Sequence, residues 1–499
     1  MASRPTSTTA NRRMTVPQVA NKLIRLWLFH LACLLIARPG HTQFSSTLSE
    51  KEFLELVQRY HPVSYQAAFT SETASQLANA ARGHFDPVAA ASWDNKRYDQ
   101  KEYWRLLQTE IKAPLLFGPD LKAGYENADG LYLDSPHILP QAGLVYMGLS
   151  IPLARDLLTD ERRTALRQAQ NMRQMGVAEQ EMLLNELFIQ AVKAYWDWTY
   201  AYASLQLYRQ FVELARVRFN AVKQGYFRGF FAAIDTVEAL IVLQTRQISQ
   251  QEAQQQYINA TLHLSNFLWD EKGLPMLLPD TVRPAIRLDT LAVPIASDRE
   301  RLRLLQLLQD HPELRHRRLK VRQLELEQRL RFNFLLPDIR LQYNFLAEPL
   351  GPNPMQWNFS PFHNNFKYGA SFRMPLLLRT ARGQYQAARL KTRISRYDVD
   401  IKELELRNKL NQALNDLAQT ALQAAINTNM VVNYQKLNEA EIAKFNIGES
   451  SVFLLNQREI KLIETLLKSY ELSAKGRKHL AELYYRAGRP WDNYVPLTK

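Results

Sequence analysis

Two long stretches of the chain repeat hydrophobic and polar positions with a helical period. In the first, apolar or small residues recur at alternating intervals of three and four. An ordinary amphipathic helix of period 3.6 would drift off such a seam over several heptads, so the pattern favours coiled-coil packing along about 58 Å. The seam comprises Leu184, Leu187, Ala191, Ala194, Trp198, Ala201, Leu205, Tyr208, Val212, Ala215, Phe219 and Val222. A second stretch, from Leu406 to Val431, keeps the stripe less regularly.

Shorter segments alternate apolar and polar residues with period two, which is typical of strands with one apolar face. The pattern is clear in residues 338–345, 366–374 and 145–151, and weaker in the segment after Pro87. We therefore predict four principal strands. Four strands cannot close a barrel, and lipid does not tolerate open sheet edges, so strands that span a membrane would have to be shared between several chains.

Landmarks recur along the chain at nearly constant offsets, which predicts a tandem repeat. The pairs are His61-Pro62 with His311-Pro312, Pro87 with Pro337, Pro152 with Pro375, and Gly229 with Gly448. The offset falls from 250 to 223 between the second and third pairs, so the first copy holds 27 extra residues there. We interpret them as an enlarged loop or an extra hairpin. Residues 43–272 and 297–490 form the two copies, with a linker at 273–296 and a tail at 491–499.

The N-terminal segment is typical of a secretory signal peptide, predicted over residues 1–42. Basic residues up to Arg25 precede the apolar stretch 26–37, which is shorter than the roughly 20 residues that a spanning helix needs. The only cysteine, Cys33, lies within it. A lipid anchor there is the alternative, disfavoured by His30. After cleavage the chain has no disulfide, so its stability depends on packing or assembly.

Composition and motifs exclude several functions. Of 499 residues 46% are hydrophobic, so the chain is not disordered, and the net charge of +14 is weak evidence for nucleic acid. Nucleotide-binding, hydrolase and zinc-protease motifs are missing, and we predict no enzyme, cofactor or metal site. The basic run 315–320 either contacts phosphates or forms a solvated face, which we favour. His61 and His311, each before a proline, are interpreted as structural.

Two glycine-containing stretches interrupt the helical patterns. They are FRGFFAAIDTVEA from Phe227 and FNIGESSVFLLNQRE from Phe445. Taken in order with five further segments, they resemble the TolC-like outer membrane efflux protein family. The five segments are PLARDLLTDERRTALRQAQ, NFLWDEKGLP, HPEL, LPDIRLQYNF and PLLLRTARGQYQAA. The resemblance covers almost all of the mature chain. It implies a mainly α fold with a membrane β-barrel part: long coiled-coil helical hairpins and four strands per protomer, in a trimer with twelve strands.

The resemblance also implies roles for individual residues. The interruptions would be hairpin tips that dock a periplasmic adaptor, comprising Gly225, Phe227, Gly229, Phe230, Phe231, Gly448, Ser450 and Ser451. Asp235 would belong to an acidic periplasmic gate, whereas Leu454 at the equivalent place puts an acid from the second copy in doubt. We expect the polar strand residues Arg340, Gln342, Lys367 and Arg373 to face the lumen or the protein side. The apolar ones, including Tyr343, Phe345, Phe366, Phe372, Leu149 and Ile151, would face lipid.

The function that follows is a passive exit duct across the outer membrane and periplasm, serving a tripartite efflux or type I secretion system. Its expected partners are two further copies of itself, a periplasmic adaptor, an inner-membrane pump and outer membrane lipid, without nucleic acid. The alternative is a soluble periplasmic coiled-coil scaffold with no pore. The strands discriminate between the two, because a scaffold does not need strands with one apolar face.

Overall fold

The computed structural model describes residues 46–135, 138–348 and 365–495. The predicted signal peptide 1–42 with Cys33, and the end of the predicted tail from 496 onward, lie outside the described residues. The described residues from Thr47 onward form one compact unit. None of the described helices is both long enough and apolar enough to span a lipid bilayer.

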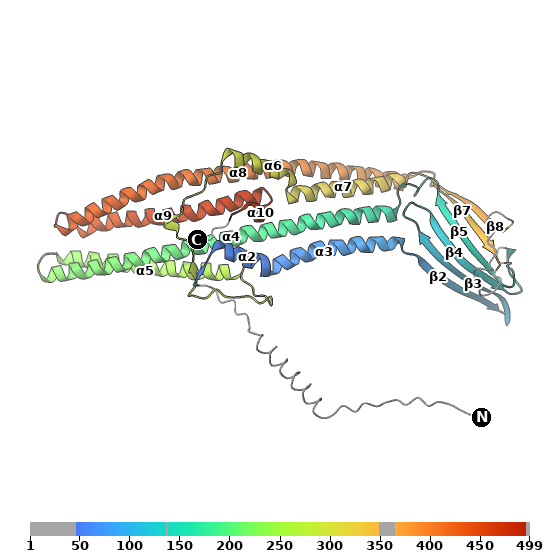
Figure 1. The fold of residues 1–499 in the computed structure, drawn as a ribbon, viewed down its shortest axis with the longest axis horizontal. Helices are drawn as coiled ribbons and strands as arrows, with labels where there is room; N and C mark the ends of the chain where they lie inside the picture. The colour runs from blue at the N-terminus through green and yellow to red at the C-terminus, as the bar shows by residue number, and fades with distance from the viewer. Residues whose placement is uncertain (1–45, 136–137, 349–364, 496–499) are drawn as a thin grey trace, which may run out of the picture. The chain divides into compact units, whose positions relative to one another are not determined.

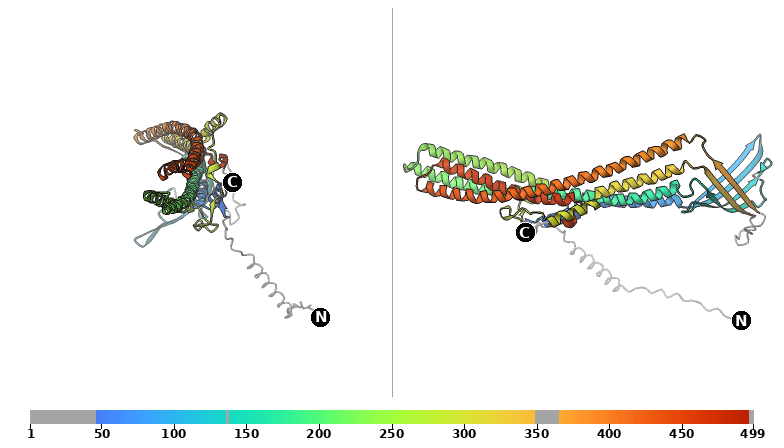
Figure 2. Two further views of the ribbon diagram at one scale, coloured as in Figure 1. Left: turned by 90° about the vertical axis from the view of Figure 1, so that its left-hand side faces the viewer. Right: turned by 90° about the horizontal axis from the view of Figure 1, so that it is seen from above.

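Two long helical hairpins dominate this unit (Figure 1). In the first, α4 (Glu161–Phe227, 67 residues) turns into α5 (Ala233–Ser265). In the second, α8 (Arg379–Asn446, 68 residues) turns into α9 (Val452–Arg486). Helix α4 also packs against α9, so the four helices form one curved layer in the order α5, α4, α9, α8 (Figure 2). At 1.5 Å per residue, α4 and α8 are each about 100 Å long.

The halves of α4 and α8 nearer the strands are covered by shorter helices. Helix α3 (Pro62–Arg82) packs against α4, and α7 (Pro312–Asn333) packs against both α4 and α8. Both begin alike: the Nδ1 atoms of His61 and His311 accept hydrogen bonds from the backbone of Val63 and Glu313, at 3.2 Å each. A proline follows each histidine at the first helical position, where its missing N–H costs nothing. The structural interpretation of the two histidines is confirmed.

The predicted seam on α4 is buried within the single chain. Leu187, Ala191, Ala194, Trp198, Ala201, Leu205, Val212, Ala215 and Val222 are buried, and Leu184, Tyr208 and Phe219 are half-buried. On α8, Leu406, Leu410, Ala413 and Leu417 are buried, and Val431, at the end of the stripe, is half-buried. The alanines keep the seam narrow, so neighbouring helices can approach closely.

Short elements beside the long helices bring the first and last described segments together. They are α2 (Glu50–Tyr60), α6 (Asp298–Leu307), α10 (Pro490–Asn493) and the parallel pair β1 (Thr47–Leu48) and β6 (Arg283–Pro284). Glu50 is fully buried here, and its carboxylate accepts hydrogen bonds from Trp196 Nε1 at 2.8 Å and from Tyr494. Arg477 pairs with Glu50 at 3.3 Å. A buried carboxylate needs such partners, so this network fixes the segments around Glu50 and Tyr494 to α4 and α9.

One antiparallel sheet of six described strands lies at the other end of α4 and α8 from the hairpin turns (Figure 1). In spatial order its strands are β2 (Val88–Tyr98), β3 (Lys101–Pro114), β4 (Asp120–Asp129), β5 (Leu144–Pro152), β7 (Asp338–Ala347) and β8 (Phe366–Arg373). The four predicted strands are present as β2, β5, β7 and β8, but the count of four per chain was wrong, because the described sheet has six. The 27 extra residues of the first copy form the hairpin β3–β4, which lies inside the sheet between β2 and β5. Of the two interpretations, the extra hairpin is the one observed.

Candidate functional site

The two hairpin turns share one backbone motif. After α4, the N–H of Phe230 donates to the carbonyl of Gly225 and that of Gly229 donates to Tyr226, both at 2.9 Å. After α8, Glu449 and Gly448 make the equivalent bonds to Lys444 and Phe445, at 2.9 and 3.1 Å. This is the Schellman motif, which needs a left-handed residue one position past the helix end. Gly229 (φ 79°) and Gly448 (φ 82°) supply that conformation.

The predicted tip residues divide into exposed and packed groups. Phe227 and Phe230 are 75% and 76% exposed, and Ile234 and Ile447 nearby are also exposed. Phe231 instead packs inward, with its ring stacked on Phe445 at 5.9 Å in a cluster with Val222, Ala239 and Val452. Gly225 is buried, and a Cβ there would meet the Phe231 ring at 2.5 Å. Phe231 and Gly225 therefore hold the two turns side by side, and the exposed aromatic surface of the tip is smaller than predicted.

The polar residues after each glycine cap the returning helix. Asp235 Oδ2 accepts a hydrogen bond from the backbone of Ala232 at 2.9 Å, at the start of α5. Ser451 accepts one from Leu454 at 3.2 Å, at the start of α9. Ser450 donates to Glu441 of α8. Asp235 is half-buried and lies in the first turn of α5, where a negative charge also favours the helix dipole.

A buried group of charges, which the sequence patterns do not reveal, joins the two hairpins near the turns. Arg218 of α4 makes a two-pronged ion pair with Glu459 of α9, at 2.8 and 2.5 Å. Arg246 of α5 is buried beside it, with Asn456 Oδ1 at 3.5 Å, and burial lowers the pKa of this guanidinium. Charged residues at inward helical positions were the available signal, but partners on different helices are not visible in one sequence.

The strand registers give the sheet one apolar and one polar face. On the apolar face Leu149 pairs with Tyr343, Tyr343 with Tyr368 and Phe345 with Phe366, and the hairpin continues it because Ile111 pairs with Ala123. The apolar face comprises Ala89, Ala91, Trp93, Leu107, Ile111, Leu121, Ala123, Val145, Met147, Leu149, Ile151, Leu341, Tyr343, Phe345, Phe366, Tyr368 and Phe372. Successive residues of a strand point to opposite faces, so the intervening residues form the polar face.

The four polar strand residues singled out in the sequence lie together on the polar face. Arg340 and Gln342 of β7 lie opposite Ser371 and Gly369 of β8, the strand that also carries Lys367 and Arg373. Arg340 binds Asp156 at 3.1 Å. The inserted hairpin adds charges to this face: Lys112 binds Asp120 at 3.1 Å and Lys122 lies 3.7 Å from Glu110. No group of His, Cys, Asp and Glu side chains suited to a metal ion occurs in the described part of the chain.

Long helical hairpins joined to one antiparallel sheet are also the fold of solved outer membrane channels. The Campylobacter jejuni channel CmeC aligns over 88% of this chain and 85% of its own, with 12% identity and a TM-score of 0.60. The open Neisseria gonorrhoeae channel MtrE aligns over 89% of each chain, with 16% identity and a TM-score of 0.62. CusC aligns over 91% of this chain and 95% of its own, with 14% identity and a TM-score of 0.63. At these identities the likeness shows the fold.

Residues 142–268 match the model of the outer membrane efflux protein family. This segment runs through β5, α4, the first turn and α5. No match was found among curated proteins. The family match confirms the predicted resemblance over this segment of the chain.

Proposed function

We propose that this chain is the exit duct of a tripartite efflux or type I secretion system, a passive conduit through the outer membrane and periplasm. The observation that supports it most is the junction of a two-faced sheet with helices about 100 Å long. In a membrane, the apolar face would contact lipid and the polar face, with Arg340, Gln342, Lys367 and Arg373, would line the lumen. A scaffold without a pore needs no such sheet.

The duct is built from three copies of the chain. The described sheet ends at β2 and β8, whose outer edges pair with no described strand. Six strands are too few for a closed barrel, and lipid excludes open edges, so each β2 would pair with β8 of a neighbouring copy. A trimer would then hold eighteen strands rather than twelve. Because barrel diameter grows roughly in proportion to strand number, the pore would be about 1.5 times as wide.

The outer helices of the layer support ring closure. Helix α5 carries a second heptad seam that is exposed in the single chain, with Ile234, Val237, Ile241, Ile248, Ile258 and Leu262 at its apolar positions. Helix α8, at the other edge, carries exposed Leu390, Ile394, Tyr397, Ile401, Leu404, Leu422, Ile426 and Met430. Apolar seams of this length are costly to leave in water. The α5 seam of one copy would pack against α8 of the next.

The hairpin tips would dock a periplasmic adaptor, which connects the duct to an inner-membrane pump. Exposed Phe227 and Phe230 offer apolar area at the rim, and nothing lies within 4 Å of a Cβ built at Gly229 or Gly448. Asp235 would bias the entrance electrostatically. We also propose the domain division into a signal peptide 1–42, repeats 43–272 and 297–490, a linker 273–296 and a tail 491–499.

Fractionation and seam substitution test the duct together. The wild-type protein should sediment with outer membranes and run as a heat-sensitive trimer on a gel. Ile241→Glu with Ile248→Glu should abolish the trimer, because it places charges in the seam. Gln256→Glu, on the exposed flank of α5, should leave the trimer intact. Protein found only in the soluble periplasm, or a trimer that survives both seam charges, would contradict the proposal.

A further inference from the structure

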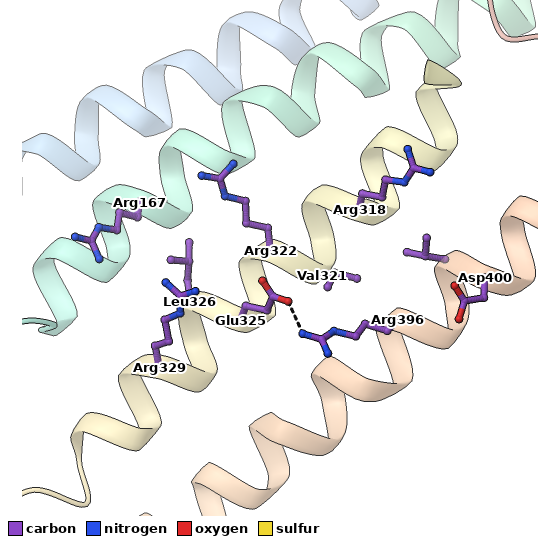
Figure 3. A pocket seen from close by; sticks show the side chains of 10 residues that line it. Arg167, Arg318, Val321, Arg322, Glu325, Leu326, Arg329, Arg396 and Asp400 are labelled. Atoms are coloured by element: carbon purple, nitrogen blue, oxygen red, sulfur yellow. Dashed lines mark hydrogen bonds and ion pairs between the residues drawn. The ribbon is translucent and has the colours of Figure 1, made fainter. Parts of the chain in front are cut away.

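A groove of about 860 Å³ lies along α7, between the parts of α4 and α8 that are nearer the sheet (Figure 3). Its charged lining consists of Arg167 from α4, Arg318, Arg322, Glu325 and Arg329 from α7, and Arg396 and Asp400 from α8. Five cations face two acids, and every cation is an arginine. Val321, Leu326 and Val399 complete the lining. The groove is therefore strongly positive, and all its positive groups are planar hydrogen-bond donors.

Only part of this charge is matched within the chain. Arg396 binds Glu325 at 2.7 Å. Arg318 donates to the Gln309 carbonyl at 2.9 Å and lies 3.6 Å from the carboxylate of Glu403. Among the described residues, Arg167, Arg322 and Arg329 form no ion pair. Figure 3 shows Arg322 extending from α7 toward α4, which carries Arg167. Three guanidinium groups are thus left available in one groove.

Folding of the chain does not account for this arrangement. Arg318 and Arg322 are four residues apart on α7, and like charges at that spacing destabilise a helix by a few tenths of a kcal/mol. Residues 379–397 of α8, which include Arg396, contain six basic and no acidic residues. Mutual repulsion of this kind is relieved when an anion binds between the guanidinium groups.

We propose that this groove binds a ligand with two or more phosphate groups. A guanidinium donates two parallel hydrogen bonds to phosphate oxygens, and a phosphate has enough oxygens to bridge several arginines. Arg329 lies eleven positions after Arg318 on α7, or about 16 Å along the helix, which exceeds the size of one phosphate. A ligand that matches the stripe therefore carries several phosphates. The basic run 315–320, left open in the sequence, enters the groove through Arg318.

Two sources could supply this chemistry, a diphosphate lipid headgroup or a soluble polyphosphate. Arg329 is four residues from the end of α7 at Asn333, or about 6 Å, and β7 begins at Asp338. The lipid source thus rests on the proposed membrane position of the sheet. The soluble source does not, so a titration in solution tests the groove separately from the proposed function.

The test compares two double variants of the purified full-length protein in detergent. Arg322→Gln with Arg329→Gln removes two groove charges, and Arg299→Gln with Arg301→Gln removes two exposed arginines of α6 as a control. Sodium tripolyphosphate, titrated by calorimetry, should bind the groove variant at least about tenfold more weakly, and the control within about twofold of wild type. Glu325→Gln should tighten binding about threefold, because it removes an acid and frees Arg396. Damage to the fold would not tighten it.

Native mass spectrometry with diphosphatidylglycerol separates the two sources. Retention of this lipid by wild type and control, but not by the groove variant, would assign the groove to a lipid headgroup. Tripolyphosphate binding without lipid retention would assign it to a soluble phosphate ligand. The proposal would be overturned if the two double variants lost affinity for tripolyphosphate equally, or if neither probe bound saturably. It would also be overturned if the protein bound poly-glutamate but neither phosphate probe.

Discussion

The buried ion pair between the hairpins yields a quantitative prediction. Replacing Glu459 by Gln keeps the shape of the side chain but removes the only carboxylate that binds Arg218 among the described residues. Glu459 is 4% and Arg218 15% exposed at the side chain, so water cannot take over the role of the lost charge. Arg246, buried in the same place, loses its compensating charge as well. We expect Glu459→Gln to lower the free energy of unfolding.

The magnitude follows from burial. Removing one partner of a buried pair costs about 3–5 kcal/mol, because an uncompensated charge remains inside. Arg218→Gln should cost less, about 1–3 kcal/mol, since Arg246 stays to balance Glu459. The matched control is the pair between Arg216 and Glu213 on α4, at 3.1 Å, whose side chains are 53% and 65% exposed. Glu213→Gln should change stability by less than about 0.5 kcal/mol.

Urea unfolding followed by far-ultraviolet circular dichroism measures these differences on the protein in detergent, from midpoints at a common slope. The expected order of destabilisation is Glu459→Gln, then Arg218→Gln, then Glu213→Gln. If Glu459→Gln unfolded at the same urea concentration as Glu213→Gln, the pair would not connect the hairpins. If Arg218→Gln were the more damaging of the two, the acid would not serve both arginines.

Three further predictions concern pH and the tips. Burial lowers the pKa of His311 to about 4, so the folded state holds the ring neutral, whereas the unfolded chain protonates it near the ordinary pKa of 6.5. The free energy of unfolding should therefore fall by about 2 kcal/mol from pH 7.5 to pH 5. In thermal unfolding, His311→Asn, which keeps the cap, should remove this contribution to the pH dependence. Gly229→Leu with Gly448→Leu should abolish efflux while the trimer stays intact. Gly229→Asn with Gly448→Asn should retain more efflux, because asparagine tolerates positive φ. Unchanged efflux in both double variants would exclude adaptor docking at the hairpin tips. Asp235→Asn removes the charge but keeps the cap of α5, so a higher channel conductance of this variant in a bilayer would show that the charge narrows the entrance. If only Asp235→Ala raised the conductance, the increase would instead result from loss of the cap.

The helices were predictable because their signals are local. The heptad pattern of α4 predicts which side of the helix packs, and the two glycines predict where the chain reverses. The buried seam and the two turns both appear where predicted. The hairpin β3–β4 was only half predicted, because offsets between repeats reveal an insertion but not its pairing. Leu107, Ile111 and Ala123 continue the apolar face only once the registers are known.

The tip and its charges required the tertiary structure. Phe231 lies among glycine and aromatic neighbours that suggest an exposed turn, yet it packs against Phe445, more than two hundred positions along the chain. Asp235 was assigned to a gate from its distance to Gly229, and the structure adds a capping bond. Arg218, Glu459 and Arg246 come from three helices, so no spacing in the sequence connects them.

The central claim is that the whole six-stranded sheet is the membrane wall of the duct, and thiol labelling tests it most directly. Single cysteines, in a Cys33→Ser background, would be placed on β3 at Ile111 and Lys112 and on β7 at Tyr343 and Gln342, in purified outer membranes. A fluorophore on the apolar sites 111 and 343 should be quenched by a lipid-borne quencher, while sites 112 and 342 should react with a water-soluble thiol reagent. Lipid quenching at 343 but not at 111 would remove the hairpin from the wall, and the absence of quenching at both would contradict the membrane duct itself.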